Sequence, residues 1–281
     1  MLGDVLRYQL LGPIRVVDGG HALAIRASKI QILLAVLLVR SGEVVTTGQL
    51  MTEIWGDGVP RRAMAGIHVY VSQLRKLLHR PGQRESPVVT CSPGYMLQLG
   101  DDELDVKAFA DLVKAGKESV REGRHAEAVT SLQAALALWH GPVFDELRAG
   151  PILEGFGTWL AELRIGCVQT LIDSQLELGR HREVIGRLHS FVVEHPLREA
   201  FYRQLMVALY RSERQAEALD VYQSARRVLI DELGLEPGRT LQNLHAAILR
   251  ADDGLDAGPS ELVLPRPRWE FDDVPTRRAS A

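Results

Sequence analysis

The sequence predicts a mainly α-helical protein with a small β component, divided into two domains. Its 281 residues are long enough for about two domains, each with its own core. Short runs of alternating apolar residues, broken by turn residues, mark the first 100 residues. From Asp105 to about Arg250 helical spacing dominates instead. We therefore expect a mixed domain at 1–100, a helical domain at 101–251 and a flexible tail at 252–281.

The first three segments predict a small antiparallel sheet. Each segment is short, and turn residues (Gly12-Pro13 and Asp18-Gly19-Gly20) separate one from the next. The predicted strands are Arg7–Leu11, Ile14–Val17 and His21–Ile25.

Three helices and a hairpin follow this sheet. Ser28 is a candidate N-cap for the first helix, and Thr46 or Thr47 for the second. Pro60 suits the first turn of the third helix. The predicted helices are Lys29 to Arg40, Gly48 to Trp55 and Pro60 to about His79, with a brief extended segment at Glu43–Thr46; the hairpin joins Pro87–Cys91 to Tyr95–Leu99 through Ser92-Pro93-Gly94.

The third helix has two contrasting faces. Apolar residues at three- and four-residue spacing predict one buried stripe. Small, polar and cationic residues opposite suit a helix in the major groove of DNA, which needs close approach, donors for base edges and cations for phosphates. The stripe is Met64, Ile67, Val71, Leu74 and Leu78, and the other face is Arg62, Ala65, Gly66, Val69, Ser72, Gln73 and Lys76, with Arg75 on its shoulder.

Taken alone, this helix would also fit an ordinary surface helix with solvated charges. The order of elements favours DNA binding, because two helices joined by a Gly-containing turn and followed by a hairpin are typical of a winged helix-turn-helix. Charge agrees. Residues 1–100 carry 11 Lys and Arg against 6 Asp and Glu, a net +5, whereas residues 101–281 carry 22 against 30, a net −8. A polyanion partner is thus expected for the first domain.

Residues 7–99 resemble the DNA-binding domain of OmpR-type regulators, on the segments HVYVSQLRKLL (68–78) and SPGYML (92–97). With LLGPIRV (10–16) and the run from RASKIQ to WGDGVP (26–60), they are similar to the Streptomyces antibiotic regulatory protein family. In that family this domain comes first and a helical activation domain follows. Since no receiver domain precedes it, we expect control by protein abundance or a bound partner rather than by phosphorylation.

The candidate DNA contacts divide by role. We expect the main contacts from two cations on the third helix and base contacts from its centre. The same helix and its neighbours supply contacts with the DNA backbone, and the wing supplies minor-groove or phosphate contacts. Tyr70 and Tyr95 could equally be aromatic residues that seal the core, and Trp55 is expected in the core. The main contacts are Arg75 and Lys76; the base contacts are Val69, Ser72 and Gln73; Tyr70, Lys29 and Thr47 face the backbone, Thr90, Ser92 and Tyr95 lie in the wing, and Arg62 completes the site.

Two residues depart from the family pattern. Gln73 stands where members often carry Arg, and Gln pairs with adenine whereas Arg prefers guanine. Gly66 lies inside the helix, where glycine costs about 1 kcal/mol relative to alanine. The base preference therefore stays open.

The second domain contains three similar segments, at 122–136, 178–192 and 212–226. Arg180 and Arg214 are 34 positions apart, which is the period of a tetratricopeptide helix pair. We expect a tetratricopeptide-like repeat domain whose helix pairs cover one another, closed by a last helix that carries Ala246, Ile248 and Leu249. The bulky aromatic residues at helical spacing are expected to pack between repeats; they are Phe201, Tyr202, Tyr210 and Tyr222.

This second domain resembles the bacterial transcriptional activator domain of the same family, on LWHGPVF (138–144), residues 194–219 and DELGLEPG (231–238). The resemblance implies an activator of antibiotic or other secondary-metabolite genes. It would bind double-stranded DNA as a homodimer on direct repeats near the promoter −35 element, and would recruit RNA polymerase holoenzyme including its sigma factor. We expect it in the cytoplasm at the nucleoid, without a membrane partner.

Other classes fit the sequence less well. Because HExxH, GxSxG, GxGxxG, CxxC and the GxxxxGK[ST] phosphate loop are all missing, we expect no enzyme activity, no metal and no cofactor. An adaptor whose winged domain contacts protein stays open, and salt-sensitive, sequence-selective DNA binding would exclude it. A repressor also stays open, because the sign of regulation depends on where the binding site lies.

Overall fold

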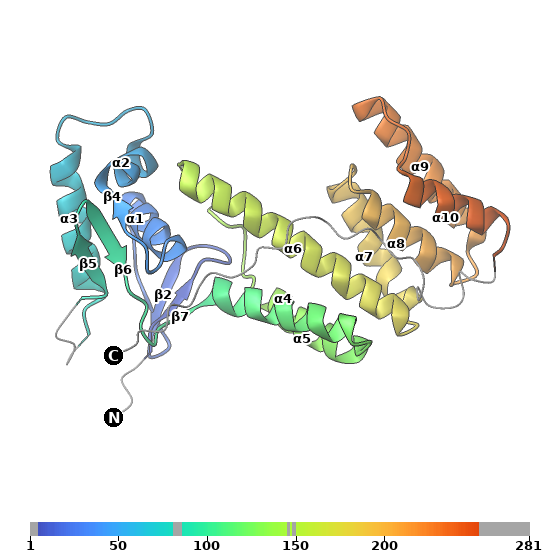
Figure 1. Ribbon diagram of the computed structural model, residues 1–281, viewed down its shortest axis with the longest axis horizontal. Coiled ribbons are helices and arrows are strands. Elements are labelled where there is room, and N and C mark those ends of the chain that lie inside the picture. Colours follow the sequence, from blue (N-terminus) through green and yellow to red (C-terminus); the bar gives the residue numbers. More distant parts are fainter. Residues whose placement is uncertain (1–4, 81–85, 145–146, 148–149, 253–281) are drawn as a thin grey trace. The chain divides into compact units, whose positions relative to one another are not determined.

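A computed structural model describes residues 5–80, 86–144, 147 and 150–252, and its elements are shown in Figure 1. The described chain is mainly helical with two small sheets, as predicted. It forms two compact units that divide between Arg180 and His181. The predicted tail, except its first residue, lies outside the described residues.

The first sheet has the strand order β3-β2-β1-β7. β1 (Arg7–Gln9) pairs antiparallel with β2 (Arg15–Asp18), which pairs antiparallel with β3 (His21–Leu23). Tyr8 and Val16 are paired partners on the inner face and are fully buried. The sequence did not indicate β7 (Glu103–Leu104), a two-residue strand that pairs in parallel with β1.

Three helices complete the predicted DNA-binding domain: α1 (Ser28–Val39), α2 (Thr47–Trp55) and α3 (Ala63–Leu77). The prediction that Ser28 caps the first helix was wrong, because Ala27 is the N-cap residue of α1 and no side chain caps the helix. Thr46 caps α2, because its hydroxyl accepts from Gln49 N while the Gln49 side chain accepts from Thr46 N. α1 is the centre of this domain, since every residue from Ile32 to Leu38 is buried.

The second sheet forms the wing, in the order β4-β6-β5. β5 (Val88–Cys91) and β6 (Gly94–Leu97) make the predicted hairpin, and β6 pairs with β4 (Val45–Thr46) immediately before α2. Gly94 lies directly against this strand, so that a Cβ at Gly94 would collide with the carbonyl oxygen of Val45. The pairing therefore requires glycine.

Three further helices belong to the same compact unit: α4 (Asp105–Arg121), α5 (His125–Ala137) and α6 (Pro151–Glu177). α4 and α5 approach closely at Gly116, where a Cβ would lie 2.6 Å from the side chain of Leu132. At the start of α4, the carboxylate of Asp105 accepts hydrogen bonds from the backbone N–H groups of Leu10 and Leu11, at 2.9 Å each. Burial raises the pKa of Asp105, in opposition to the hydrogen bonds from Leu10 and Leu11.

The second compact unit contains α7 (His181–Glu194), α8 (Glu199–Tyr210), α9 (Gln215–Leu233) and α10 (Arg239–Leu249). α5, α7 and α9 begin at equivalent points of the three similar segments. Phe201, Tyr202 and Tyr222 are buried and Tyr210 is half-buried, which confirms that these aromatic residues pack inside the repeat domain. In α10, Ile248 is buried whereas Leu249 is 58% exposed, so Leu249 does not share in the predicted cap.

We expect Gly94→Ala to destabilise the wing by roughly 1–3 kcal/mol, because the added methyl meets backbone, which relaxes less than a side chain. Urea unfolding followed by circular dichroism measures the change. Gly48→Ala is the matched control, since its nearest heavy atom would be Thr46 Oγ1 at 3.9 Å. Equal unfolding midpoints for the two variants would show that the Gly94 contact is relieved by movement of β4.

Candidate DNA interface

The exposed face of α3 is the centre of the candidate site. Ala63, Ile67, Val71, Leu74 and Leu78 form a buried stripe that fixes α3 on the domain core. The opposite face is exposed to solvent and carries hydrogen-bond donors, cations and small side chains, and Val69 on it is 52% exposed. The exposed candidates on this face are Arg62, Val69, Ser72, Gln73 and Lys76, together with Ala65.

The predicted stripe was wrong at Met64, which is 44% exposed, while Ala63 is 3% exposed. Ala63 lies four residues before Ile67 and shares its direction on the helix. Met64 is rotated by about 100° from that position. The large apolar side chain suggested burial, but α3 begins at Ala63 and its orientation follows the deeper residues.

Arg75 is tied to the wing. Its Nε donates to the carbonyl oxygen of Val88 at 2.9 Å, and its Nη2 donates to Thr90 Oγ1 at 2.8 Å. The guanidinium also lies 6.0 Å from the ring centroid of Tyr95. Arg75 thus joins α3 to β5, the neighbouring strand in Figure 1, in addition to any contact it makes beyond the protein.

The wing residues separate into exposed and buried positions. Thr90 near the end of β5 and Ser92 in the turn are both exposed, so both are open to a partner. Tyr95 is only 7% exposed and belongs to the hydrophobic core, which corrects its prediction as a DNA contact. Its strand β6 pairs on both sides, and three of its four residues, Gly94, Tyr95 and Leu97, are buried.

Trp55 packs against α3 at Gly66 and Tyr70. It is half-buried, its ring centroid lies 6.0 Å from that of Tyr70, and Lys29 Nζ lies 5.1 Å from the Trp55 ring centroid. A Cβ at Gly66 would lie 3.3 Å from the Trp55 ring, tighter than ordinary packing. This contact accounts for a glycine inside α3. Trp55 packs against the core as predicted, and Tyr70 is half-buried beside it.

Thr47 connects the start of α2 to the tip of the wing. Its backbone N–H donates to the carbonyl oxygen of Pro93 at 3.2 Å, and its hydroxyl donates to the same oxygen at 3.4 Å. Thr47 is half-buried by this contact. The α2 N-terminus, the wing turn and the α3 surface are therefore fixed relative to one another.

Buried carboxylates are the residues that the sequence did not reveal. Asp102 accepts from Leu6 N and from Arg80, each at 3.0 Å, and Glu53 on α2 is 2% exposed. Glu53 follows Leu50 by three residues and precedes Ile54, so its place on the apolar face of α2 was a usable signal.

Other kinds of site lack support in the described residues. No group of three or more His, Cys, Asp or Glu side chains there is placed to hold a metal ion. Cys91 and Cys167 are free thiols, and burial raises the pKa of Cys167 to about 11. Among the described helices, none combines the length and apolar character needed to cross a membrane.

Two family models match the chain. The model described as "Transcriptional regulatory protein, C terminal" matches residues 23–97, and the one described as "Bacterial transcriptional activator domain" matches residues 104–249. Together they cover the candidate interface and both groups of helices that follow it.

Curated relatives are transcriptional regulators. The chain is 38% identical to the regulatory protein AfsR of Streptomyces griseus, over 93% of this chain and 26% of AfsR. It is 36% identical to the transcriptional regulatory protein EmbR of Mycobacterium tuberculosis, over 91% of this chain and 66% of EmbR. It is 32% identical to the regulatory protein DnrI of Streptomyces peucetius, over 92% of this chain and 97% of DnrI. The chain thus spans about a quarter of AfsR but nearly all of DnrI.

A solved structure of Mycobacterium tuberculosis EmbR in complex with a low-affinity phosphopeptide has the same fold. The TM-score is 0.83 at 35% sequence identity, and the match covers 88% of this chain and 66% of that chain. The order of a winged domain followed by a helical domain is therefore shared.

We expect Arg75→Lys to loosen the wing although it keeps the positive charge, because lysine lacks the planar fork that reaches Val88 and Thr90 together. Hydrogen–deuterium exchange across 88–97 should become roughly tenfold faster. Lys76→Ala, on the exposed face of the same helix, is the control and should leave this exchange unchanged. Unchanged exchange in Arg75→Lys would mean that strand pairing alone holds the wing.

Proposed function

The chain belongs to the Streptomyces antibiotic regulatory protein family, and we propose that it is a sequence-specific DNA-binding activator of transcription. The observation that carries the proposal is the exposed face of α3, held between the wing and Trp55. On this face Val69, Ser72 and Gln73 supply a methyl-contacting group and hydrogen-bonding groups at helical spacing, with Arg62 and Lys76 at its two ends. A helix of this kind fits the major groove, and an adjacent hairpin fits the neighbouring phosphates.

Each candidate residue then has a role. Val69 would contact a thymine methyl, Ser72 and Gln73 would hydrogen-bond base edges, and Arg62 and Lys76 would pair with phosphates. Lys29 lies at the start of α1 beside Trp55, where its ammonium group would reach the phosphate backbone of the DNA. Thr47 at the α2 N-terminus and Tyr70 on α3 would contact the DNA backbone, and Thr90 and Ser92 in the wing would reach the neighbouring minor groove or its phosphates. Arg75 would combine support of the wing with a phosphate contact through its remaining N–H groups.

The activator role extends the family assignment. Two copies would bind side by side on direct repeats near a promoter −35 element. Residues 1–100 would read the DNA, and both the winged and the helical domain would contact RNA polymerase holoenzyme with its sigma factor. Expected targets are antibiotic or other secondary-metabolite genes, which rests on membership of the family alone. In vitro transcription with the chain added decides whether the chain activates or represses. More transcript supports activation, and less transcript from the same promoter indicates a repressor.

Selection from a random DNA pool, followed by electrophoretic shift on the selected site, tests DNA reading. We expect Lys76→Ala to weaken binding and to reduce the slope of log affinity against log salt by about 0.9, the share of one phosphate contact. Lys107→Ala on α4, also exposed but remote from α3, is the control and should bind like the wild type. Selection of no sequence by the wild-type chain would instead favour an adaptor whose winged domain contacts protein.

Gln73 sets base preference in this proposal. Gln73→Arg is expected to change the selected base at one position of the site from adenine to guanine, with discrimination of roughly 1–3 kcal/mol. The same pool selection measures it, with Ser72→Ala as the neighbouring comparison. An unchanged selected sequence would place Gln73 outside the base-reading set.

A further inference from the structure

Glu53 is a buried charge on α2 that has no part in the DNA-reading surface. Its neighbours Leu50 and Ile54 belong to the hydrophobic core, and Glu53 itself is 2% exposed. A carboxylate in such a position is unfavourable unless strong donors compensate for the lost water. The donors therefore identify what the residue does.

Both carboxylate oxygens accept backbone N–H groups from the first turn of α6. Ile152 N donates to Oε1 at 2.7 Å and Leu153 N donates to Oε2 at 3.3 Å. The N-cap of α6 is Gly150, which has no side chain to offer, and Pro151 has no N–H. Glu53 thus caps, from about 100 positions earlier in the chain, a helix that has no side-chain cap of its own, and its charge also complements the positive end of the helix dipole.

The backbone of α6 fits closely around this carboxylate. A Cβ at Gly150 would lie 2.7 Å from Glu53 Cα and 2.8 Å from the carboxyl carbon. Only glycine leaves room for α2 and the start of α6 to approach to this distance. Gly150 and Glu53 therefore form one contact between α2 and the start of α6, which we call the joint.

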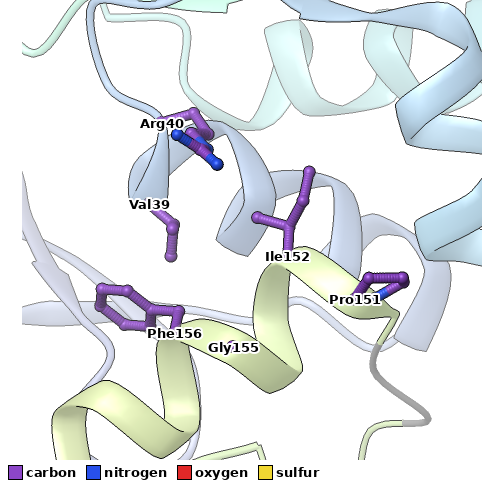
Figure 2. A pocket seen from close by; sticks show the side chains of 6 residues that line it. All are labelled: Val39, Arg40, Pro151, Ile152, Gly155 and Phe156. Carbon is purple, nitrogen blue, oxygen red and sulfur yellow. The ribbon is translucent and has the colours of Figure 1, made fainter.

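Next to this joint, packing between α1 and α6 is incomplete. A cavity of about 410 Å³ lies between the end of α1 and the first turns of α6, and Figure 2 shows the side chains around it. Val39 ends α1 and Arg40 follows it, whereas Ile152 and Phe156 come from α6. Beside this cavity, the Glu53 hydrogen bonds act together with the burial of Leu153 in the core to hold the first turn of α6.

We propose that Glu53 is a positioning residue that fixes α6 to α2, so that the winged domain and α6 move as one body. α2 also contacts the tip of the wing through Thr47, six residues before Glu53. Binding of DNA by the winged domain would consequently set the direction of α6 and of the polymerase-contacting surface built on it. This last step rests on the proposed function, whereas the joint itself does not.

Glu53→Gln in the full chain tests the joint, since it removes the charge and keeps the shape. Hydrogen–deuterium exchange of the amides of Ile152 and Leu153, without DNA, should become roughly tenfold faster as the charged acceptor is lost. Glu127→Gln, at an exposed side chain of α5, is the matched control and should leave this exchange unchanged. Wild-type exchange in Glu53→Gln would overturn the proposal.

A second arm tests coupling to DNA. We expect Glu53→Gln to bind the selected DNA site within about threefold of the wild type, because the base-reading face of α3 is untouched, yet to lose more than half of the stimulated transcription. Full stimulation by a folded Glu53→Gln variant would overturn the coupling.

If the wild-type chain binds no DNA, the proposed function fails, and the exchange experiment still decides whether Glu53 holds the start of α6. If Glu53→Gln does not fold, Gly150→Ala examines the joint from the α6 side and is expected to speed exchange of the same two amides, while wild-type exchange in that variant would overturn the proposal.

Discussion

The segment Leu10–Leu11 carries a constraint on which the first compact unit depends. Its two N–H groups are bound by the Asp105 carboxylate at the start of α4, and the carbonyl oxygen of Leu11 accepts from His140 N at 2.9 Å. Both leucines are fully buried, so their backbone groups have no access to water and need these partners. The chain leaving β1 is thus held at once by the helix that follows the wing and by the segment that follows α5.

Glu53 provides the same kind of joint at another place. In each case a carboxylate from one element accepts two consecutive backbone N–H groups of another, and charged acceptors make such bonds stronger than neutral ones. Gly12 and Gly150 both lie at these joints, and a Cβ at either would be under 3.0 Å from the opposing side chain. The two glycines permit contact at a distance that an ordinary residue would prevent.

Local periodicity predicted most of the elements and the division of α3 into a buried and an exposed face. The 3.6-residue pattern placed Ile67, Val71 and Leu74 inside and Val69 and Lys76 outside, because both sets follow from one helix on one core. The misses share a physical origin. Arg75 bonds to a strand 13 residues later, and Glu53 bonds to a helix about 100 residues later. The apolar face of α2 could signal that Glu53 is buried, but no local pattern identifies the partner of either residue. Tyr95 needed the register of β6 to decide between core and surface.

The joints at Glu53 and at Leu10–Leu11 have a consequence for how such chains evolve. Winged domains and helical repeats are usually regarded as modules that recombination can exchange, with a crossover near residue 100. In this chain a new partner after residue 100 would have to supply an acceptor for Leu10 and Leu11 and a helix start for Glu53. A crossover between Arg180 and His181 keeps both joints intact. The winged domain therefore depends on α4–α6 for these partners, whereas neither joint involves the helices after Arg180.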